Sequence, residues 1–393
     1  MNLVLQILFW ISLGILFYCY IGYGLMLWLF NNINVLLQKN KPKCTRETPP
    51  VTIIIAAYNE ADMLEKKIRN TLAIDYPADK LKVVIVTDGS ADGSENIVKR
   101  FPEIILMHQA QRRGKYAAIK RAMQTVSTPL VVFSDANTML NPECLKKIMP
   151  HYQDENIGGV AGEKKILQNR AESVVGEAEG LYWQYESFLK KMDASFFSIV
   201  GAAGELFSIR THLFSPVDDH VILDDFIISM QVCLQGYRFA YEPDAFATET
   251  ASDSLIEESK RKIRIAAGAY QSVYILKAGL SVFKYPLLSF QYLSRRLFRW
   301  VLCPLSIVLV FAANLLLVIF FNNDLFSSLL FLQTVFYAFA FLGWGYVSAG
   351  KKAGIFTIPF YFVFMNFCLV KGFLRFVKGR QSVLWEKSVR SAL

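Results

Sequence analysis

The sequence predicts an α/β domain with a mostly parallel sheet, flanked by apolar segments that can cross a membrane. From Pro50, short β-branched runs alternate with helical stretches, which is typical of a parallel sheet covered by helices on both faces. Hydrophobic residues make up 53% of the chain and concentrate at its two ends. Between those ends, three apolar runs finish in an acidic residue. Open α/β sheets bind ligands at the carboxyl ends of their strands, so this edge is expected to handle a nucleotide diphosphate.

Residues 1–32 are predicted to form an N-terminal transmembrane anchor. The stretch from Leu3 to Phe30 carries no charge and exceeds the roughly 20 residues that cross a bilayer. It has neither a basic start nor a small-residue cleavage site, so a retained anchor fits better than a signal peptide. Four basic residues follow it, at Lys39, Lys41, Lys43 and Arg46. By the positive-inside rule, the next domain is expected on the cytoplasmic side of the cell membrane.

Residues 301–370 are predicted to be the C-terminal membrane segments of a multi-pass protein. Within them, Val301–Phe321 and Leu325–Val347 indicate a helical hairpin, and Ile355–Val370 is a shorter apolar run. Residues 371–393 form a basic tail, which a full third crossing would place outside the cell, against the positive-inside rule. A re-entrant or partly embedded third segment with a cytoplasmic tail is therefore expected.

Residues 282–300 place basic side chains among aromatic ones and are predicted to form an interfacial amphipathic helix. The formal net charge of +9 suits contact with anionic membrane lipids. No basic run in the soluble part is interleaved with base-stacking aromatics, so a nucleic-acid partner is not expected. The six cysteines are scattered without paired spacing, which supports neither a disulfide framework nor a zinc site.

Residues 48–275 are predicted to form the α/β domain. Its first half is expected to contain, in order, a strand at Val51–Ala56, a helix at Glu60–Ala73, a strand at Leu81–Thr87, a helix at Asp92–Phe101, a strand at Ile104–Met107, a helix at Lys115–Thr125 and a strand at Leu130–Ser134. Its second half is expected to contain a long helix at Ala171–Met192, a strand near Leu206–Ile209, a helix from Leu223 to Leu234 and closing strands at Tyr237–Tyr241 and Ala245–Thr250.

Asp135 and Asn137 end the fourth expected strand. A carboxylate in this place is costly to bury without a partner. Carboxylate and amide oxygens, completed by substrate phosphates and water, are suitable ligands for Mg²⁺ or Mn²⁺. The sequence therefore predicts a divalent metal site here. The alternative is that Asn137 caps the helix that follows.

The loops after the first two strands suit a nucleoside. The polar loop at residues 56–60 can receive a base and a ribose, although Asn59 would serve equally as a helix cap. Asp88 is followed by a glycine-containing turn and can accept hydrogen bonds from a ribose or a base N–H. The alternative is an ordinary strand-to-helix turn that Asp92 caps.

Two basic groups suit phosphate oxygens. Residues 112–115, which end in Lys115, open a helix, where cations and free N–H groups bind anions. Arg261 and Arg264 share one helix face and together suit a departing diphosphate. The alternatives are a solvated basic turn for the first group and a solvated or membrane-facing patch for the second.

Asp224 and Asp225 begin a helix after an apolar run. One carboxylate is suited to act as a general base that takes the proton from an attacking hydroxyl, while the other orients it or caps the helix. The alternative is a double acidic cap, which the helix dipole favours.

Taken in order, these elements resemble the family-two membrane glycosyltransferases, the group of cellulose, chitin, hyaluronan and poly-N-acetylglucosamine synthases. The resemblance spans residues 50–268 and is carried by Ala57-Tyr58-Asn59-Glu60, Asp88-Gly89-Ser90, Arg112-Arg113-Gly114-Lys115, Asp135-Ala136-Asn137, Gly201-Ala202-Ala203-Gly204 with Arg210, and Asp224-Asp225. It implies a GT-A fold and inverting transfer of a sugar from a nucleotide-diphosphate sugar, with a UDP-sugar as the expected donor.

The resemblance also implies roles for single residues. Tyr58, Glu60 and Asp88 would line the nucleoside pocket. Asp135 and Asn137 occupy the place of the family's Asp-x-Asp metal motif. Asp225 would act as the base. Lys115 and Arg264, together with the metal, would stabilise the charge on the diphosphate.

The chain departs from the family pattern at two places. Asn137 replaces the second acid of the metal motif, which weakens its coordination of a cation. The processive members carry Gln-x-x-Arg-Trp, where this chain has residues 261–265 in the order Arg-Lys-Ile-Arg-Ile. That tryptophan would lie under the acceptor sugar, so its absence leaves open whether this protein builds long chains. Trp183 and Trp385 are the candidates to replace it.

The prediction is a membrane-anchored, metal-dependent, inverting glycosyltransferase that extends a growing glycan. The first alternative is transfer of a single sugar to a polyprenyl-phosphate or other lipid-linked acceptor. A second alternative is a membrane nucleotide-sugar sensor without catalysis. The presence of both Asp135 and Asp225 argues against the sensor, because a binding protein has no need of a base.

Overall fold

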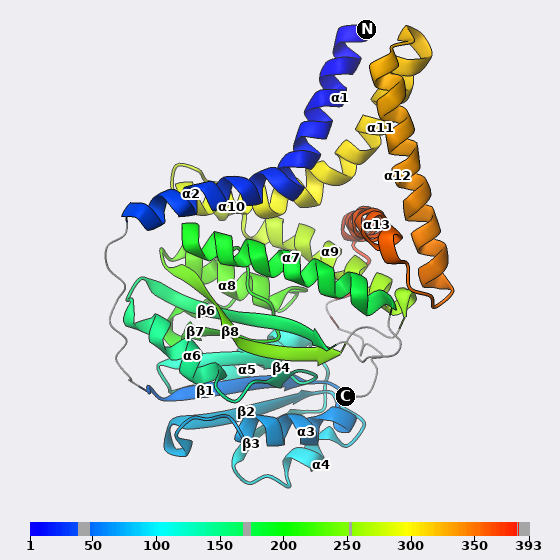
Figure 1. The fold of residues 1–393 in the computed structure, drawn as a ribbon. Helices are drawn as coiled ribbons and strands as arrows, with labels where there is room; N and C mark the ends of the chain where they lie inside the picture. The colour runs from blue at the N-terminus through cyan, green and yellow to red at the C-terminus, as the bar shows by residue number, and fades with distance from the viewer. Residues whose placement is uncertain (38–47, 168–173, 251–253, 383, 385–393) are drawn as a thin grey trace.

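The computed structural model describes residues 1–37, 48–167, 174–250, 254–382 and 384. An α/β domain built on one sheet forms its lower part in Figure 1, and long apolar helices rise above that domain. The helices α7 and α9 lie between these two parts. The described helices are α1 (Asn2–Phe17), α2 (Tyr23–Leu37), α3 (Ala61–Leu72), α4 (Ser94–Val98), α5 (Lys115–Met123), α6 (Cys144–Ile148), α7 (Val174–Phe196), α8 (Asp224–Leu234), α9 (Leu255–Ile275), α10 (Pro286–Tyr292), α11 (Cys303–Phe321), α12 (Asp324–Ser348) and α13 (Thr357–Val377).

The sheet has eight strands in the order β3-β2-β1-β4-β7-β6-β8-β5. Its strands are β1 (Val51–Ala57), β2 (Leu81–Asp88), β3 (Ile104–Gln109), β4 (Leu130–Asp135), β5 (Met139–Leu140), β6 (Ile157–Leu167), β7 (Phe207–Arg210) and β8 (Arg238–Thr250). The first four strands pair in parallel, and β7 runs antiparallel to both β4 and β6. The mostly parallel sheet predicted from the sequence is therefore present, and the polar ends of β1, β2 and β4 meet at one edge.

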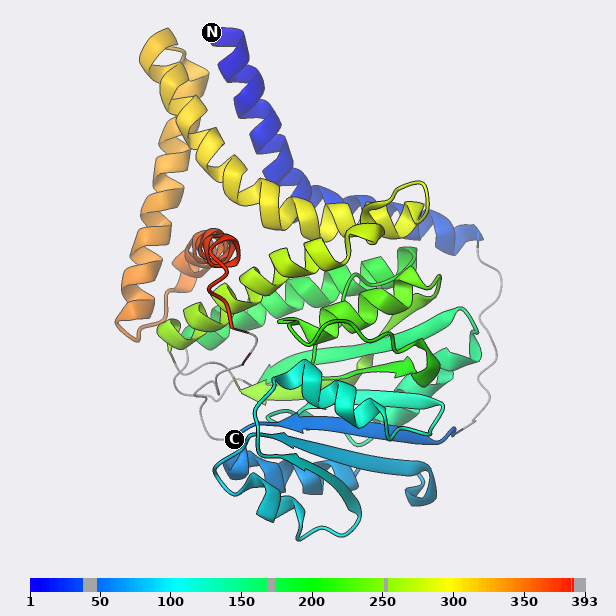
Figure 2. The ribbon, with the colours of Figure 1, turned by 180° about the vertical axis from the view of Figure 1, so that it is seen from behind.

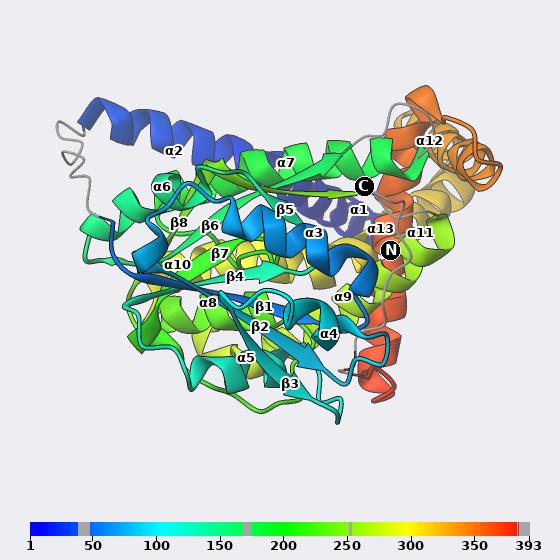
Figure 3. The same ribbon diagram turned by 90° about the horizontal axis from the view of Figure 1, so that it is seen from below.

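Both faces of the parallel half of the sheet are covered by helices. Ile54 of β1 packs in one apolar cluster with Ile119 of α5, whereas Ile53 and Ile55 pack in another with Leu64 of α3. Figure 3 shows α3 and α5 on opposite sides of β1. Successive strand residues point to opposite faces, so a strand buried on both sides reads as a continuous apolar run.

The second half of the sheet differs from the expectation. The two closing strands predicted at 237–241 and 245–250 form the single strand β8, and its pairing with β6 shifts register between Gly162 and Glu163. The strand β6, which contains the Gly158-Gly159 pair, lies in a region where the sequence predicted no strand. Here a glycine is required by packing: a Cβ on Gly159 would collide with the ring of Phe239 in the neighbouring strand.

Four apolar stretches are long enough to cross a membrane by length and composition, at Asn2–Ile33, Pro286–Phe321, Asp324–Ser348 and Gly354–Val377. The first bends at a π-helical turn, Tyr18–Gly22, so that α1 rises away from the domain while α2 lies along its upper surface (Figure 1). Figure 2 shows that α10 and α11 make a similar bend. The region predicted as an N-terminal transmembrane anchor, residues 1–32, thus contains two helices with different surroundings.

A buried charge cluster joins these bent helices to α7. Arg295, within the predicted interfacial helix, is only 2% exposed, and its guanidinium lies 2.9 Å from Glu186 and 3.0 Å from Asp193. From the N-terminal helix, the hydroxyl of Tyr23 donates a 2.5 Å hydrogen bond to the same Asp193 carboxylate. Removing one member of such a buried pair leaves an uncompensated charge, which is strongly destabilising.

The helix α13 packs along α9 and is seen end-on in Figure 1, where it crosses the direction of α12. It continues to Val377, beyond the predicted end of the apolar segment at residue 370. The first basic residues of the predicted tail, Lys371 and Arg375, therefore lie on a helix. Gly372 allows the close packing, because a Cβ there would collide with Ala266 of α9.

Candidate active site

A cavity of about 1250 Å³ opens between the carboxyl edge of the sheet, α7, α9 and the C-terminal half of α13. Its charged lining residues are Glu60, Lys115, Asp135, Lys164, Glu186, Lys190, Glu205, Asp224, Asp225, Glu249, Glu257, Lys260, Arg261, Lys262, Arg264, Arg296, Lys371, Arg375, Lys378 and Arg380. Asn137 lines the cavity as well, whereas Tyr58 and Asp88 lie outside this lining. The predicted catalytic and metal-binding residues are therefore brought together.

Asp88 holds the loop that precedes α5. Its carboxylate is fully buried and accepts hydrogen bonds from the backbone N–H groups of Gly114, at 2.7 Å, and Arg113, at 3.0 Å. These bonds fix the backbone immediately before Lys115, so Asp88 positions the phosphate-binding turn predicted from the sequence. The sequence showed that Asp88 is polar and ends a strand, but it could not show this backbone partner.

A planar pair lies beside that turn. The guanidinium carbon of Arg112 is 3.5 Å from the centre of the Tyr58 ring, which is close stacking of a cation on an aromatic face. The loop carrying Tyr58 is tied to the loop after β2, because Asn59 Oδ1 accepts a 2.9 Å hydrogen bond from Ala91 N. Asn59 has a φ of 54° and does not cap α3; that position belongs to Glu60.

Lys115 lies between two acidic groups of the cavity. Its Nζ is 2.6 Å from Asp135 Oδ1 and 3.3 Å from Asp224 Oδ2. Burial alone would lower the pKa of Lys115, but the neighbouring carboxylates outweigh burial and raise it. Gly204 approaches this pair closely, since a Cβ there would lie 3.0 Å from Lys115 Nζ and 3.3 Å from Asp135 Oδ2. The Gly201–Gly204 motif thus leaves room for the ion pair.

Asp225 has the properties of a base that works near neutral pH. Burial, followed by the charge of Asp224, raises its pKa to about 7, while Lys115 acts in the opposite direction. Its Oδ1 accepts a 2.7 Å hydrogen bond from Phe226 N. A carboxylate with a pKa near the working pH is well matched to accept a proton from a hydroxyl.

Arg264 is the cation that faces these acids from α9. Burial lowers its pKa, and the charges of Asp224, Asp225 and Asp135 partly offset that effect. Its buried Nε has no hydrogen-bond partner within the described part of the chain. A buried N–H group without a partner is costly, so a ligand with oxygen acceptors fits this position.

Arg261 does not join that group. It is paired with Glu258, 2.9 Å away, and with Glu179 of α7, and these two acids raise its pKa despite the opposing effect of burial. Both arginines line the cavity, but Arg261 is paired with these two glutamates, whereas Arg264 faces the aspartates. The glutamate partners lie 3 and 82 residues from Arg261, and only the nearer one is visible as helix spacing.

Asn137 and a second charge cluster complete the cavity. Asn137 Nδ2 donates a 3.3 Å hydrogen bond to Glu249, which leaves its amide oxygen directed elsewhere. Glu249 is also paired with the buried Lys164, whose Nζ lies 2.5 Å from Glu205 and 4.7 Å from the Trp183 ring. Sequence reasoning missed these three charged residues, because they come from β6, β8 and the turn before β7.

Comparison with known proteins identifies the domain. The family model described as glycosyl transferase family 2 matches residues 52–214, which include Lys115 and Asp135. This part of the chain is similar to family 2 glycosyltransferase domains. The resemblance predicted from the motifs is confirmed for these residues.

Two curated relatives support the assignment. The poly-beta-1,6-N-acetyl-D-glucosamine synthase of Staphylococcus aureus (strain MSSA476) is 25% identical over 280 residues, which are 68% of this chain and 64% of the synthase. The probable glycosyltransferase YdaM of Bacillus subtilis (strain 168) is 23% identical over 257 residues, or 59% of this chain and 58% of that protein. The chain thus spans less than two thirds of the length of these relatives.

A solved structure confirms the predicted GT-A fold. It is the mannosyltransferase PcManGT from Pyrobaculum calidifontis in complex with GDP-Man and Mn²⁺, and it is 21% identical. The similarity covers 95% of this chain and 99% of that one, with a TM-score of 0.70. The apolar helices of this chain are therefore included in the structural likeness.

Proposed function

We propose that this enzyme transfers a sugar, with inversion, from a nucleotide-diphosphate sugar to a glycan acceptor at the cytoplasmic face of the cell membrane. The observation that carries the proposal is the grouping of Lys115, Asp135 and Asp225 with Arg264 in one cavity. With Asp224, the group contains two cations and three acids. The cations suit a departing diphosphate, and the acids provide for removal of a proton from an acceptor.

The donor is expected to lie along the carboxyl edge of the sheet. The Tyr58–Arg112 stack offers a flat surface for the base, and Glu60 lines the adjoining cavity. Lys115 and the free Nε of Arg264 then face the diphosphate from two sides. Arg261 is left out of this set, because its charge is satisfied by glutamates. A UDP-sugar remains the expected donor from the family resemblance.

The donor set suits a divalent cation. No group of three or more His, Cys, Asp or Glu side chains among the described residues is arranged to hold a metal by itself. Asp135 and the amide oxygen of Asn137 supply two hard oxygen ligands, which fits Mg²⁺ or Mn²⁺ when substrate phosphates and water complete the shell. Such an ion would neutralise charge on the leaving diphosphate.

The transfer itself follows from the placement of Asp225. The acceptor hydroxyl oxygen attacks the anomeric carbon and forms the new glycosidic bond as its proton passes to Asp225. The bond between that carbon and the donor phosphate oxygen breaks, and its electron pair leaves with the nucleotide diphosphate. Attack opposite the leaving group inverts the anomeric configuration.

Trp183 supports a glycan as the acceptor. It lies on α7 in the cavity lining, and its ring can stack under a sugar face where the family's usual tryptophan is absent. Trp385, the other substitute considered, lies outside the described residues. A second candidate acceptor, a lipid-linked one, is favoured by an apolar cavity that adjoins the catalytic cavity.

The test is a screen of radiolabelled nucleotide sugars with membranes that contain the full chain, followed by sizing of the product. We expect the wild type to incorporate the sugar of one of the nucleotide sugars. Asp225→Asn should incorporate none of them but should still bind the donor. Metal-dependent release of nucleotide diphosphate without acceptor separates the enzyme from a sensor. Near-normal transfer by Asp225→Asn would overturn the assignment of the base.

A further inference from the structure

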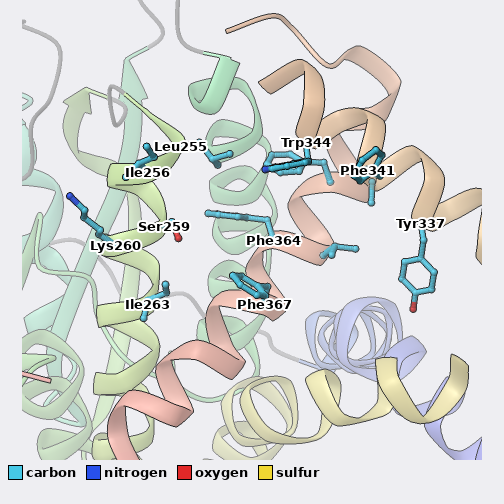
Figure 4. Close-up of a pocket in the computed structure, with 13 residues that line it drawn as sticks. Leu255, Ile256, Ser259, Lys260, Ile263, Tyr337, Phe341, Trp344, Phe364 and Phe367 are labelled. Carbon is cyan, nitrogen blue, oxygen red and sulfur yellow. The ribbon is translucent and has the colours of Figure 1, made fainter. Parts of the chain in front are cut away.

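An apolar cavity of about 640 Å³ lies between α9, α12 and α13. Figure 4 shows Trp344 of α12 and Phe364 of α13 projecting toward α9, whereas Tyr337 points away from it. The lining consists of Leu255, Ile256, Ser259, Lys260, Ile263, Tyr337, Ala340, Phe341, Trp344, Phe360, Val363, Phe364 and Phe367. This volume is within the range of cavities that hold small ligands, and Lys260 is the only charged residue in the lining.

The apolar cavity adjoins the catalytic one. Four residues line both of them, namely Ser259, Lys260, Ile263 and Phe367. They lie on the facing sides of α9 and α13, two helices that pack along each other. A ligand lodged between α12 and α13 can therefore extend past this boundary into the cavity that contains Asp225.

The two adjoining cavities differ in character. At the outer end, Phe341 is 68% exposed and Trp344 50% exposed on α12, a helix apolar enough to lie in a bilayer. At the inner end, Lys371, Arg375 and Arg264 line the catalytic cavity. An elongated site with an apolar outer end and a cationic inner end is complementary to a lipid with an anionic head group.

We propose that the apolar cavity holds the hydrocarbon chain of a lipid phosphate, whose head group enters the catalytic cavity as the acceptor or as the carrier of the acceptor glycan. The inference rests on the proposed transferase function for the role of the lipid. The chain is held by aromatic and aliphatic side chains on α9, α12 and α13, and the phosphate is held by the cations of α9 and α13. A bulk phospholipid is the competing occupant.

The test uses the purified full chain in detergent micelles and a polyprenyl phosphate that carries a benzophenone at the end of its chain. Photolabelled peptides are identified by mass spectrometry, with undecaprenyl phosphate or phosphatidylglycerol as the competitor. We expect labels on the cavity residues of α12 and α13, removed by undecaprenyl phosphate and not by phosphatidylglycerol. Equal competition by both lipids would show a bulk-lipid site and overturn the proposal.

A pair of matched variants tests the cavity itself. Val363→Trp fills the cavity, while Val370→Trp adds the same bulk on the same helix at a position that lines neither cavity and is 44% exposed. Labelling should fall about tenfold in the first variant, because excluding even about two methylene groups costs that much affinity. In Val370→Trp it should stay at the wild-type level. Equal labelling of both variants would contradict the proposal.

A second variant guards against misfolding. Ile256→Glu puts a carboxylate in the lining at a side chain that is 69% exposed, so folding is not at risk, and labelling should fall here too. Release of nucleotide diphosphate without acceptor is measured on every variant. If both cavity variants release nucleotide diphosphate normally and are labelled as strongly as the wild type, the lipid site is wrong and the transferase function stands. If labelling is normal but no nucleotide diphosphate is released, the transferase function is wrong and the lipid site stands.

Discussion

Lys115 Nζ lies 2.6 Å from Oδ1 of Asp135, so that the first residue of α5 is tied to the last residue of β4. Asp135 is also the proposed ligand of a divalent cation. In the donor-free protein, the ammonium and a metal ion therefore compete for one carboxylate. When a diphosphate is bound, it can accept the ammonium and leave the carboxylate to the metal.

Because of this competition, a change at Lys115 should strengthen the binding of the metal ion and weaken the binding of the donor. Lys115→Gln should bind Mn²⁺ about fivefold more tightly without donor, because a neighbouring positive charge has been removed at a partly exposed site. The same variant should have a higher KM for the nucleotide sugar. Electron paramagnetic resonance of free Mn²⁺ measures the first effect and steady-state kinetics the second. Weaker Mn²⁺ binding in the variant would contradict the shared carboxylate.

The pH dependence of transfer should report the Asp225 carboxyl group. Its pKa is raised to about 7, so it is protonated and inactive as a base below that pH, and kcat/KM should increase as pH rises through about 7. Asp224→Asn removes a negative charge that contributes to the raised pKa. The acid limb of the kcat/KM profile should therefore move to lower pH. A limb that stays in place would exclude Asp225 as the titrating group.

The two arginines of α9 should separate stability from donor binding. Arg264→Gln should raise the donor KM about 10- to 100-fold by removing a charged hydrogen-bond donor, with little change in Tm. Arg261→Gln should instead lower the free energy of unfolding by about 3 kcal/mol, because it takes the cation from between Glu258 and Glu179. Thermal unfolding and donor kinetics on both variants distinguish the roles. If Arg261→Gln instead raised the donor KM and Arg264→Gln lowered the Tm, Arg261 would be the residue that binds the donor.

Gly204→Ala should impair catalysis without unfolding the protein. The added Cβ would lie 3.0 Å from Lys115 Nζ, at the end of a flexible side chain that can move. Displacing this ammonium by a few tenths of an ångström is expected to lower kcat about 10-fold or more. Gly345→Ala is the matched control, because no heavy atom lies within 4 Å of a Cβ there. Equal activity of the two variants would show that the close approach has no catalytic importance.

Trp183→Ala should affect the acceptor and not the donor. Loss of a stacking surface is expected to raise the acceptor KM about three- to tenfold and to shorten any polymer. Trp183→Phe keeps an aromatic face and should restore most of the product length. Release of nucleotide diphosphate without acceptor should be unchanged in both. An altered rate of that release would indicate a role for Trp183 in the donor site.

Local sequence was sufficient for the parallel half of the fold. The strands β1, β2 and β4 are continuous apolar runs, and their polar ends at Asp88 and Asp135 are visible without a structure. Asp225 and Arg264, which were chosen from motif order, both line the cavity. These features depend on residues that are close in the chain or on the shared direction of parallel strands.

Contacts between distant segments could not be predicted in the same way. Arg261 was expected to bind the donor together with Arg264, but its guanidinium is paired with Glu179, which is 82 residues away. The bend between α1 and α2 contains no proline, and Tyr23, which follows it directly, donates a hydrogen bond to Asp193, 170 residues away. A hydrophobic pattern indicates that such a helix is apolar, but it does not indicate which polar side chains will meet.

The cluster of Tyr23, Asp193, Glu186 and Arg295 has a practical consequence. Its acids belong to α7, while its hydroxyl and guanidinium come from helices that are apolar enough to lie in a bilayer. A soluble fragment trimmed to the α/β domain would keep two buried carboxylates and lose their counter-charge. The α/β domain and the apolar helices are thus not separable modules, and purification should retain the apolar helices at both ends.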